Sequence, residues 1–286
     1  MRRLLCLLDG YEGGEAALPT ALTVGRALDA YVEALHIQAD PREAMPIAAE
    51  GMTATMIDSI LDAVAQDNQA RQARVRELYD RHVRAAGLPE APPDDPAPPG
   101  FAVGFRITQG HAATIVAREG MLYDLIVLAR HHGEGEPPVS EILEAAIMES
   151  GRPVLVAPGA APDSLGTRPA VAWRATVPGV HALSGALPLL RRATHTTVLT
   201  VGETGKGPPP DEVVRYLNVH AIPATAAQVA GESEDVGQSI LAQAAAVEAD
   251  LLVMGAYAHS RLRQLILGGV TRTVLTAARL PLLLAH

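Results

Sequence analysis

Two glycine-containing stretches near the C-terminus have the types and spacing of residues that hold an anion. Gly255 ends an apolar segment, and Gly268-Gly269 precedes an apolar helix expected over Val270 to Ala278. A glycine at the carboxyl end of a buried strand lets a ligand approach the backbone, and the free N–H groups and dipole of a helix start favour an anion. A phosphate site at this sheet edge is therefore one hypothesis for these residues. The alternative is that these glycines only end a strand and turn the chain into its last helix.

Other chemistries are less well supported. Gly205-Lys206-Gly207 lacks the hydroxyl residue and the upstream glycine of a P-loop. His131-His132 with Glu134 has no third ligand at a supporting spacing, so a polar loop is favoured over a metal site. Ser260 beside His259 does not form a nucleophile elbow. Hydrolytic chemistry is therefore not expected.

An internal duplication indicates which elements position the glycines. Asp124 to Leu128 reappears as Asp250 to Met254 at an offset of 126 residues, and Arg152 to Val156 is echoed by Leu280 to Leu284 at an offset of 128. A near-constant offset across two strands and the helix between them indicates a duplicated unit. Each half is interpreted as β-α-β-α-β-α-β-α-β. Continuous apolar strands that alternate with helices predict a parallel sheet covered on both faces.

The first half carries an insertion. Asp9 corresponds to Arg174 at an offset of 165, which falls to 126 by the fourth strand, so 39 extra residues lie between Asp40 and Gly100. The insertion at about 40–100 is expected to contain a helical region over Thr53 to Ala86. Its remainder, Gly87 to Gly100, has too many prolines for a helix or central strand and is interpreted as an exposed, stiff connector.

Length and composition limit the class of protein. The chain has 286 residues, which favours two domains, placed at 1–158 and 168–286 with a linker between them. A net charge of −9 argues against a nucleic-acid partner, and no apolar run approaches the length of a membrane span. The single cysteine, Cys6, excludes an intramolecular disulfide framework, and the cytoplasm is the expected location.

These features together resemble a known family. A first strand ending in Asp9-Gly10, the Asp-Leu-Leu-Val-Met-Gly strand at 250–255 and the Gly-Gly-Val-Thr helix start at 268–271 are similar to those of universal stress proteins with two domains in tandem. The resemblance implies an α/β fold of the adenine-nucleotide α-hydrolase-like type, with Rossmann-type layering and a five-stranded parallel sheet in each domain. It also implies a homodimer and binding of ATP, with Mg accompanying the nucleotide and no other metal.

The nucleotide motif of the family is only partly kept. The ATP-binding members have Gly, two residues, Gly, nine residues, then Gly-Ser or Gly-Thr. In the second half Gly255 is the first glycine, Ala258 replaces the second, and Gly268 is the third. Gly269 stands where the hydroxyl residue belongs, followed by Val270 and Thr271.

The departures from the motif are expected to reduce the free energy of nucleotide binding. An alanine forced into a left-handed conformation costs about 1 to 2 kcal/mol. A missing hydroxyl contact to a phosphate costs about 1.5 to 3 kcal/mol. The sum weakens a site by roughly two to three orders of magnitude. Arg174, Arg261 and Arg272 restore affinity if they face the phosphates; the alternative is that these side chains are solvated.

The end of the first strand of the second half and the matching positions of the first half also bear on ligand binding. Trp173 and Arg174, at a strand end, are expected to line the ligand crevice, with core packing as the alternative for the tryptophan. Arg174 also occupies the place of the family's nucleotide-contacting aspartate. The first half keeps Asp9-Gly10 but has Ser140 and Glu141 in the places of Gly268 and Gly269, and a glutamate there repels phosphate. The first domain is therefore expected to bind no ATP.

Three functions are compatible with this sequence. The leading hypothesis is a non-catalytic stress-response protein with weak adenine-nucleotide binding in its second domain. The second is an enzyme that hydrolyses or transfers nucleotides, for which only part of a phosphate clamp is present. The third is a structural scaffold that dimerises through its apolar last strand, Leu280 to Leu284.

Overall fold

The computed structural model describes residues 1–11, 13–41, 53–92, 100–130, 141–162, 164–201, 207–229, 235–257 and 269–286. The strands are β1 (Arg3–Leu7), β2 (Tyr31–Gln38), β3 (Ala102–Gln109), β4 (Leu125–Ala129), β5 (Val154–Ala157), β6 (Pro169–Ala172), β7 (Thr196–Val201), β8 (Ala224–Val229), β9 (Leu251–Gly255) and β10 (Leu282–Ala285). The α-helices are α1 (Ala17–Leu28), α2 (Ala54–Tyr79), α3 (Ala112–Gly120), α4 (Glu141–Glu149), α5 (Val177–Leu190), α6 (Pro210–Val219), α7 (Val236–Ala246) and α8 (Gly269–Ala277). A short 3₁₀ helix (Gly14–Ala16) precedes α1, and a π-helical turn (Asp80–Arg84) continues α2.

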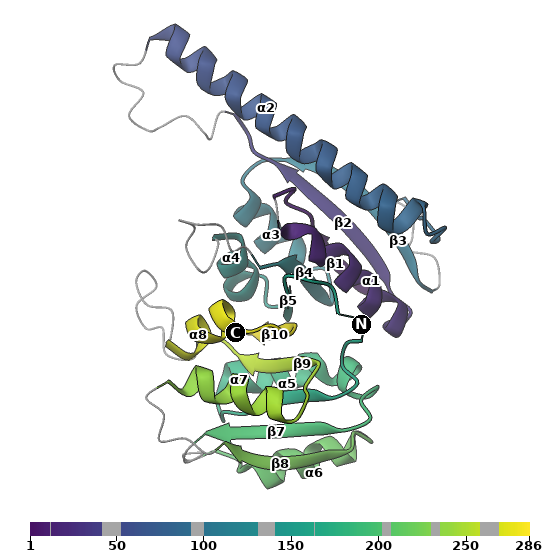
Figure 1. Ribbon diagram of the computed structural model, residues 1–286, viewed down its shortest axis with the longest axis vertical. Helices are drawn as coiled ribbons and strands as arrows, with labels where there is room; N and C mark the ends of the chain where they lie inside the picture. Colours follow the sequence, from purple (N-terminus) through teal and green to yellow (C-terminus); the bar gives the residue numbers. More distant parts are fainter. Residues whose placement is uncertain are drawn as a thin grey trace.

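The chain has the duplicated α/β architecture that its sequence predicts. Strands and helices alternate through each half in the same order, and the ten strands form one sheet in the order β3-β2-β1-β4-β5-β10-β9-β6-β7-β8 (Figure 1). Within each half every pair of neighbouring strands is parallel. The two five-stranded halves are therefore tandem parallel sheets joined edge to edge.

The junction between the halves is formed by their last strands. β5 pairs antiparallel with β10, with Leu155 opposite Leu283, and β10 pairs with β9 on its other side. The side chains of Leu282, Leu283 and Leu284 are fully buried. Both edges of β10 are thus used inside the chain, so the expectation that a scaffold dimerises through this last strand is wrong.

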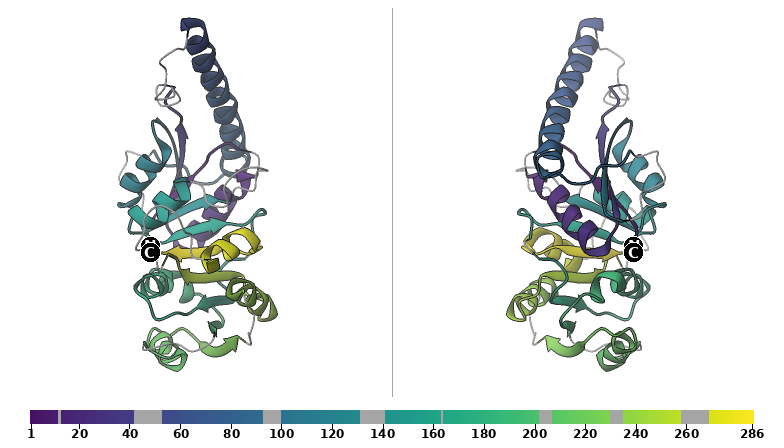
Figure 2. Two further views of the ribbon diagram at one scale, coloured as in Figure 1. Left: turned by 90° about the vertical axis from the view of Figure 1, so that its left-hand side faces the viewer. Right: turned by 90° about the vertical axis from the view of Figure 1, so that its right-hand side faces the viewer.

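Helices cover both faces of the sheet (Figure 2). On one face α1, α2, α5 and α6 pack their apolar side chains in one core, and on the other α3, α4, α7 and α8 form a second core. Sequential strands that step in one direction place their helices on one face, and the reversal of direction places the next helices on the other. The carboxyl ends of β1 and β4, and of β6 and β9, therefore flank the two points where a ligand crevice is expected.

The insertion differs from expectation in part. Its helical region forms α2, which extends beyond the end of the sheet (Figure 1). The connector is not wholly exposed, because Glu90 forms a parallel bridge with Val103 of β3 and Ala91 is buried. Two backbone hydrogen bonds explain the difference: the N–H of Ala91 donates to the carbonyl of Val103, and the N–H of Val103 donates to the carbonyl of Pro89. Ala91, unlike the prolines of the connector, has an N–H with which to bond to the sheet edge. Residues 93–99 lie outside the described residues.

Candidate functional site

The turn from β6 into α5 holds a fixed tryptophan. The backbone N–H of Trp173 donates to Leu199 on β7 at 2.8 Å, and its indole Nε1 donates to the carbonyl of Pro208 at 3.0 Å. The residue is only 7% exposed. Because both donors are satisfied, the ring is held in one orientation at the carboxyl end of β6.

The start of α5 is packed closely against the end of β9. Thr176 caps the helix by accepting a hydrogen bond from the N–H of Gly179 at 3.2 Å. A Cβ atom added to Gly255 would lie 2.5 Å from the backbone nitrogen of Gly179 and 2.6 Å from the carbonyl carbon of Pro178. Gly255 therefore allows the first turn of α5 to approach β9, a packing role that the sequence analysis did not foresee.

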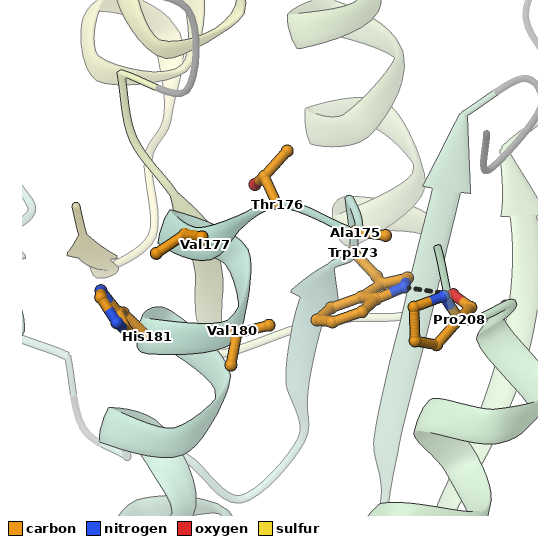
Figure 3. Close-up of a pocket in the computed structure, with 7 residues that line it drawn as sticks. All are labelled: Trp173, Ala175, Thr176, Val177, Val180, His181 and Pro208. Atoms are coloured by element: carbon orange, nitrogen blue, oxygen red, sulfur yellow. Dashed lines mark hydrogen bonds between the residues drawn. The ribbon is translucent and has the colours of Figure 1, made fainter. Parts of the chain in front are cut away.

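A pocket of about 440 Å³ lies beside this turn (Figure 3). Its lining residues come from the β6–α5 turn, the first turns of α5 and the segment before α6, and they are Trp173, Ala175, Thr176, Val177, Val180, His181 and Pro208. Val177 and Val180 are 67% and 51% exposed. A mostly apolar wall beside an aromatic ring suits a flat ring such as a nucleobase. The polar side-chain groups of the lining are the hydroxyl of Thr176, the imidazole of His181 and the indole N–H of Trp173, which is bonded to Pro208.

The edge of the pocket is connected to the end of β9. His181 donates from Nδ1 to a backbone oxygen of His286 at 2.7 Å, and Nδ1 of His286 donates to the carbonyl of Ala256 at 3.2 Å. The ring of Tyr257 stands edge-on to that of His286, with centroids 6.5 Å apart. Burial, with a smaller contribution from the charge of Glu144, raises the pKa of Tyr257 to about 12, so its hydroxyl stays protonated at neutral pH.

The other residues expected at the site do not line this pocket, or they lie outside the described residues. Arg174 follows Trp173 and is exposed, and it is not among the pocket's lining residues. Gly269, Val270 and Thr271 form the first turn of α8, where Thr271 is buried and no described atom lies within 4 Å of a Cβ added to Gly269. This helix belongs to the opposite face of the sheet from α5. Ala258, Arg261 and Gly268 lie outside the described residues, as do His131-His132, Glu134, His259 and Ser260.

Sequence reasoning missed most of the pocket wall. Thr176 followed by Val-Pro-Gly has the signature of a helix start, with a capping residue and a proline in the first turn. The position of Val177 in the first turn of a helix could therefore have been predicted from the sequence. Pro208 had no signal, because its role depends on the distance between the segment before α6 and the indole of Trp173.

The matching edge of the first domain is covered by α2. A Cβ atom added to Gly10 would lie 2.7 Å from the carbonyl oxygen of Arg71 and 2.8 Å from its Cβ. Arg74 donates from Nε to the carbonyl of Gly10 at 2.6 Å, and the guanidinium of Arg71 stacks on Tyr11 with 4.9 Å between its carbon and the ring centroid. The long inserted helix therefore lies on the turn after β1, where the second domain has the turn after β6 and its pocket.

A buried histidine lies next to this covered edge. His36, at 0% exposure, donates from Nδ1 to the carbonyl of Leu8 at 2.6 Å. Burial lowers its pKa; the nearby Arg71 charge lowers it further, while the hydrogen bond to Leu8 and the charge of Asp9 oppose the shift. The imidazole is therefore neutral in the folded protein at neutral pH.

The start of α4 has a carboxylate where the start of α8 has a glycine. Glu141 is the first residue of α4, as Gly269 is of α8, and both helices have nine residues. The carboxylate of Glu141 lies 3.6 Å from Nε2 of His111. A carboxylate occupies the helix start at which an anion would bind.

Two wider searches concern the described residues alone. No group of three or more His, Cys, Asp or Glu side chains in the described ranges is arranged to hold a metal ion. Within the same ranges, no helix has both the length and the apolar character needed to cross a membrane.

Comparison with known proteins supports the fold. Residues 181–286 match the model of the universal stress protein family. No curated protein sequence matches the chain. A universal stress protein from Archaeoglobus fulgidus DSM 4304 has a similar structure, with 17% identity and a TM-score of 0.66 over 99% of this chain and 95% of its own.

Two structures from Pseudomonas aeruginosa are also similar. A functionally unknown protein of strain PAO1 has 14% identity and a TM-score of 0.56 over 100% of this chain and 92% of its own. A putative universal stress protein of strain UCBPP-PA14 has 14% identity and a TM-score of 0.54 over 100% of this chain and 93% of its own. At these identities the likeness concerns the fold.

Proposed function

Because residues 181–286 belong to the universal stress protein family and the whole chain has the tandem fold of such proteins, we propose that it is a non-catalytic, cytoplasmic stress-response protein. Its second domain, 168–286, binds an adenine nucleotide weakly with accompanying Mg, and its first domain, 1–158, binds none. Nucleotide occupancy then changes how the protein contacts other macromolecules.

The pocket beside Trp173 is the observation that carries this proposal. A base that stacks on an aromatic side chain gains about 1 to 3 kcal/mol, which alone supports only weak binding. The phosphate end of the motif is reduced, since Ala258 and Gly269 replace a glycine and a hydroxyl residue. Weak binding follows from a base site that is present and a phosphate site that is incomplete.

The restriction to one domain follows from the two helices after the second strand of each half. α6 has ten residues and is preceded by Pro208, which contributes to the pocket wall. α2 has 26 residues and lies on Gly10 at the corresponding turn of the first domain. A ligand in the first domain would have to displace Arg71 and Arg74.

Intrinsic fluorescence tests the proposal directly, because Trp173 is the only tryptophan in the chain. Titration with ATP and Mg is expected to quench its emission with saturation, and released phosphate is expected to stay at the level of the blank. The absence of saturable quenching would contradict nucleotide binding, and turnover well above the blank would contradict a non-catalytic role.

A pair of charge variants locates the binding. Val177→Glu adds a negative charge at the pocket edge and is expected to weaken ATP binding about threefold or more, since a charge several ångströms from a polyanion costs about 0.5 to 1 kcal/mol in water. Val219→Glu adds the same charge on α6, outside the pocket and at an 85% exposed position, and is expected to leave binding unchanged. Equal weakening by both variants would contradict the location.

A further inference from the structure

The end of β4 carries a buried cation at the junction between the two domains. Arg130 directly follows β4 of the first domain and is only 5% exposed. Its Nη1 donates to the carbonyl of Ala278, the residue that follows α8 in the second domain. Its Nε and Nη2 have no hydrogen-bond partner among the described residues. Within that part of the chain, the guanidinium therefore makes its hydrogen bond to the other domain.

Burial of this guanidinium is costly. It lowers the pKa of Arg130, and in the described ranges no nearby charge opposes the shift. A guanidinium nevertheless stays charged at neutral pH, and a buried charge without an ionic partner destabilises a fold. An apolar side chain of similar length would avoid this cost, so the packing of β4 alone does not account for an arginine at this position.

The group that Arg130 contacts is the negative end of a helix. The N–H of Ala278 donates to the carbonyl of Val274 at 3.0 Å, so Ala278 continues the last turn of α8. The last carbonyls of a helix have no N–H partner within it, and the helix dipole places a partial negative charge there. A cation at this position stabilises the helix end and opposes the fraying of its last turn.

The other end of α8 is the phosphate end of the proposed nucleotide site. Gly269 begins the helix and is exposed. Between the two ends, Thr273 donates from Oγ1 to Oδ2 of Asp235 at 3.2 Å, and Asp235 caps α7 of the same domain. A helix of nine residues is about 14 Å long and moves as one rod, so a shift of its carboxyl end is passed on to Gly269.

The internal duplication gives this contact a counterpart. The offset of 126 residues between the fourth strands pairs Arg130 with Ala256, and the next residue of the second domain is Tyr257. Tyr257 is buried, and burial and, to a smaller extent, the charge of Glu144 on α4 of the first domain raise its pKa. The end of the fourth strand of each domain thus lies near the last helix of the other domain.

We propose that Arg130 is a positioning residue for the nucleotide site of the second domain: from the first domain it holds the carboxyl end of α8, and so fixes the helix start at Gly269 where the phosphates bind. This inference rests on the proposed binding of ATP in the second domain. It gives the first domain a part in that binding although it holds no nucleotide itself. Because Arg130 lies at the end of α8 opposite to Gly269, its removal affects the phosphate end and leaves the base pocket at Trp173 unchanged.

Titrations with two ligands, each followed by the fluorescence of Trp173, test this role. Arg130→Met removes the charge and the donors but keeps an unbranched side chain. It should weaken the binding of ATP with Mg by about fivefold or more, the lower end of typical coupling between sites. The binding of adenosine, which has no phosphate, should not change. Arg130→Lys keeps a charge at the helix end and should recover part of the affinity for ATP.

Arg152→Met is the matched control. Arg152 also donates to a backbone carbonyl, that of Met121, at 2.9 Å from Nε and 2.6 Å from Nη2, but this contact lies within the first domain and is exposed. The control removes the same kind of side chain and the same kind of hydrogen bond without touching α8. It should bind ATP and adenosine like the wild type.

Hydrogen exchange without nucleotide measures the contact separately. The amides of the last turn of α8, from Val274 to Ala278, should exchange about tenfold faster in Arg130→Met, which corresponds to about 1.4 kcal/mol and lies within the range for a cation at a helix carboxyl end. In Arg152→Met they should exchange at the wild-type rate. Unchanged exchange in Arg130→Met would overturn the inference, because α8 would then be held without Arg130.

The titrations separate this inference from the proposed function. A wild-type chain without saturable quenching by ATP would contradict the proposed function itself. Wild-type binding that Arg130→Met leaves unchanged would overturn the inference alone. Equal weakening of ATP and adenosine would also overturn it, because the loss would then include the base pocket. If Arg130→Met does not fold, Arg130→Gln, which removes the charge but keeps a donor, takes its place with the same expected and refuting results.

Discussion

Gly255 offers the sharpest test of how the candidate site is built. It ends β9, and the space beside its Cα is filled by the first turn of α5, with Gly179 N at 2.5 Å and Pro178 C at 2.6 Å from an added Cβ atom. The substitution Gly255→Ala places a methyl group in that space. Ordinary contacts between such atoms are about 3.5 to 4.0 Å, so the helix start must move by about 1 Å.

The cost of this movement follows from what must shift. Overpacking in a well-packed region costs about 1 to 3 kcal/mol, and here the obstacle is backbone, which cannot rotate away. Displacement of α5 also weakens the Thr176 cap, worth about 1 kcal/mol. We expect a loss of about 2 to 3 kcal/mol in the free energy of unfolding, with weaker ATP quenching because Thr176 and Val177 line the pocket.

Urea unfolding followed by the fluorescence of Trp173 measures the loss without nucleotide. With a slope of about 1 to 3 kcal/mol per molar urea, the midpoint should fall by about 0.7 to 3 M. Gly269→Ala is the matched control in the same motif, because no atom of the described residues lies within 4 Å of its added Cβ, and its midpoint should not fall. Equal midpoints for Gly255→Ala, Gly269→Ala and the wild type would refute the packing role and leave only a ligand role for Gly255.

Two other predictions concern buried polar groups in the first domain. His36 has a folded pKa below its ordinary value of about 6.5, so the unfolded state binds more protons below that pH and stability falls with acidification, by at most about 1.4 kcal/mol per pH unit. His36→Asn should flatten this decline between about pH 6.5 and 5 in urea unfolding, and an unchanged pH dependence would contradict it. Burial alone would raise the pKa of Glu33, but hydrogen bonds from Tyr123, Arg106 and Arg3 lower it, so its contribution is present above the ordinary carboxyl pKa and is lost as pH falls through the lowered one. Tyr123→Phe removes the 2.6 Å bond to Glu33 and should cost about 1 to 3 kcal/mol at pH 7, with acid unfolding at higher pH; stability equal to the wild type would contradict the role of this bond.

Much of the fold could be predicted from the sequence because it is repeated. The offset of 128 residues places Glu141 where Gly269 stands, and both residues begin nine-residue helices. The pairing of β5 with β10 had no such signal. It joins Val156 to Leu282, far apart in the chain, and an apolar strand looks the same whether its neighbour comes from the same chain or from another.

The candidate site was only partly predictable for the same reason. Trp173 was placed at a strand end, and in the structure it lines a pocket there. Arg174, chosen with it, is exposed and is not among the residues that line the pocket. The contact of Arg71 with Gly10 depends on the direction of the inserted helix, which neither its length nor its periodicity specifies.

The central claim is that only the second domain keeps a nucleotide pocket, and hydrogen exchange with and without ATP and Mg tests it most directly. The account predicts slower exchange in peptides that cover the β6–α5 turn and the first turns of α5, from Ala175 to His181, with no change at the start of α1 beside Gly10. Slower exchange at Gly10, or no change in either domain at saturating nucleotide, would contradict it.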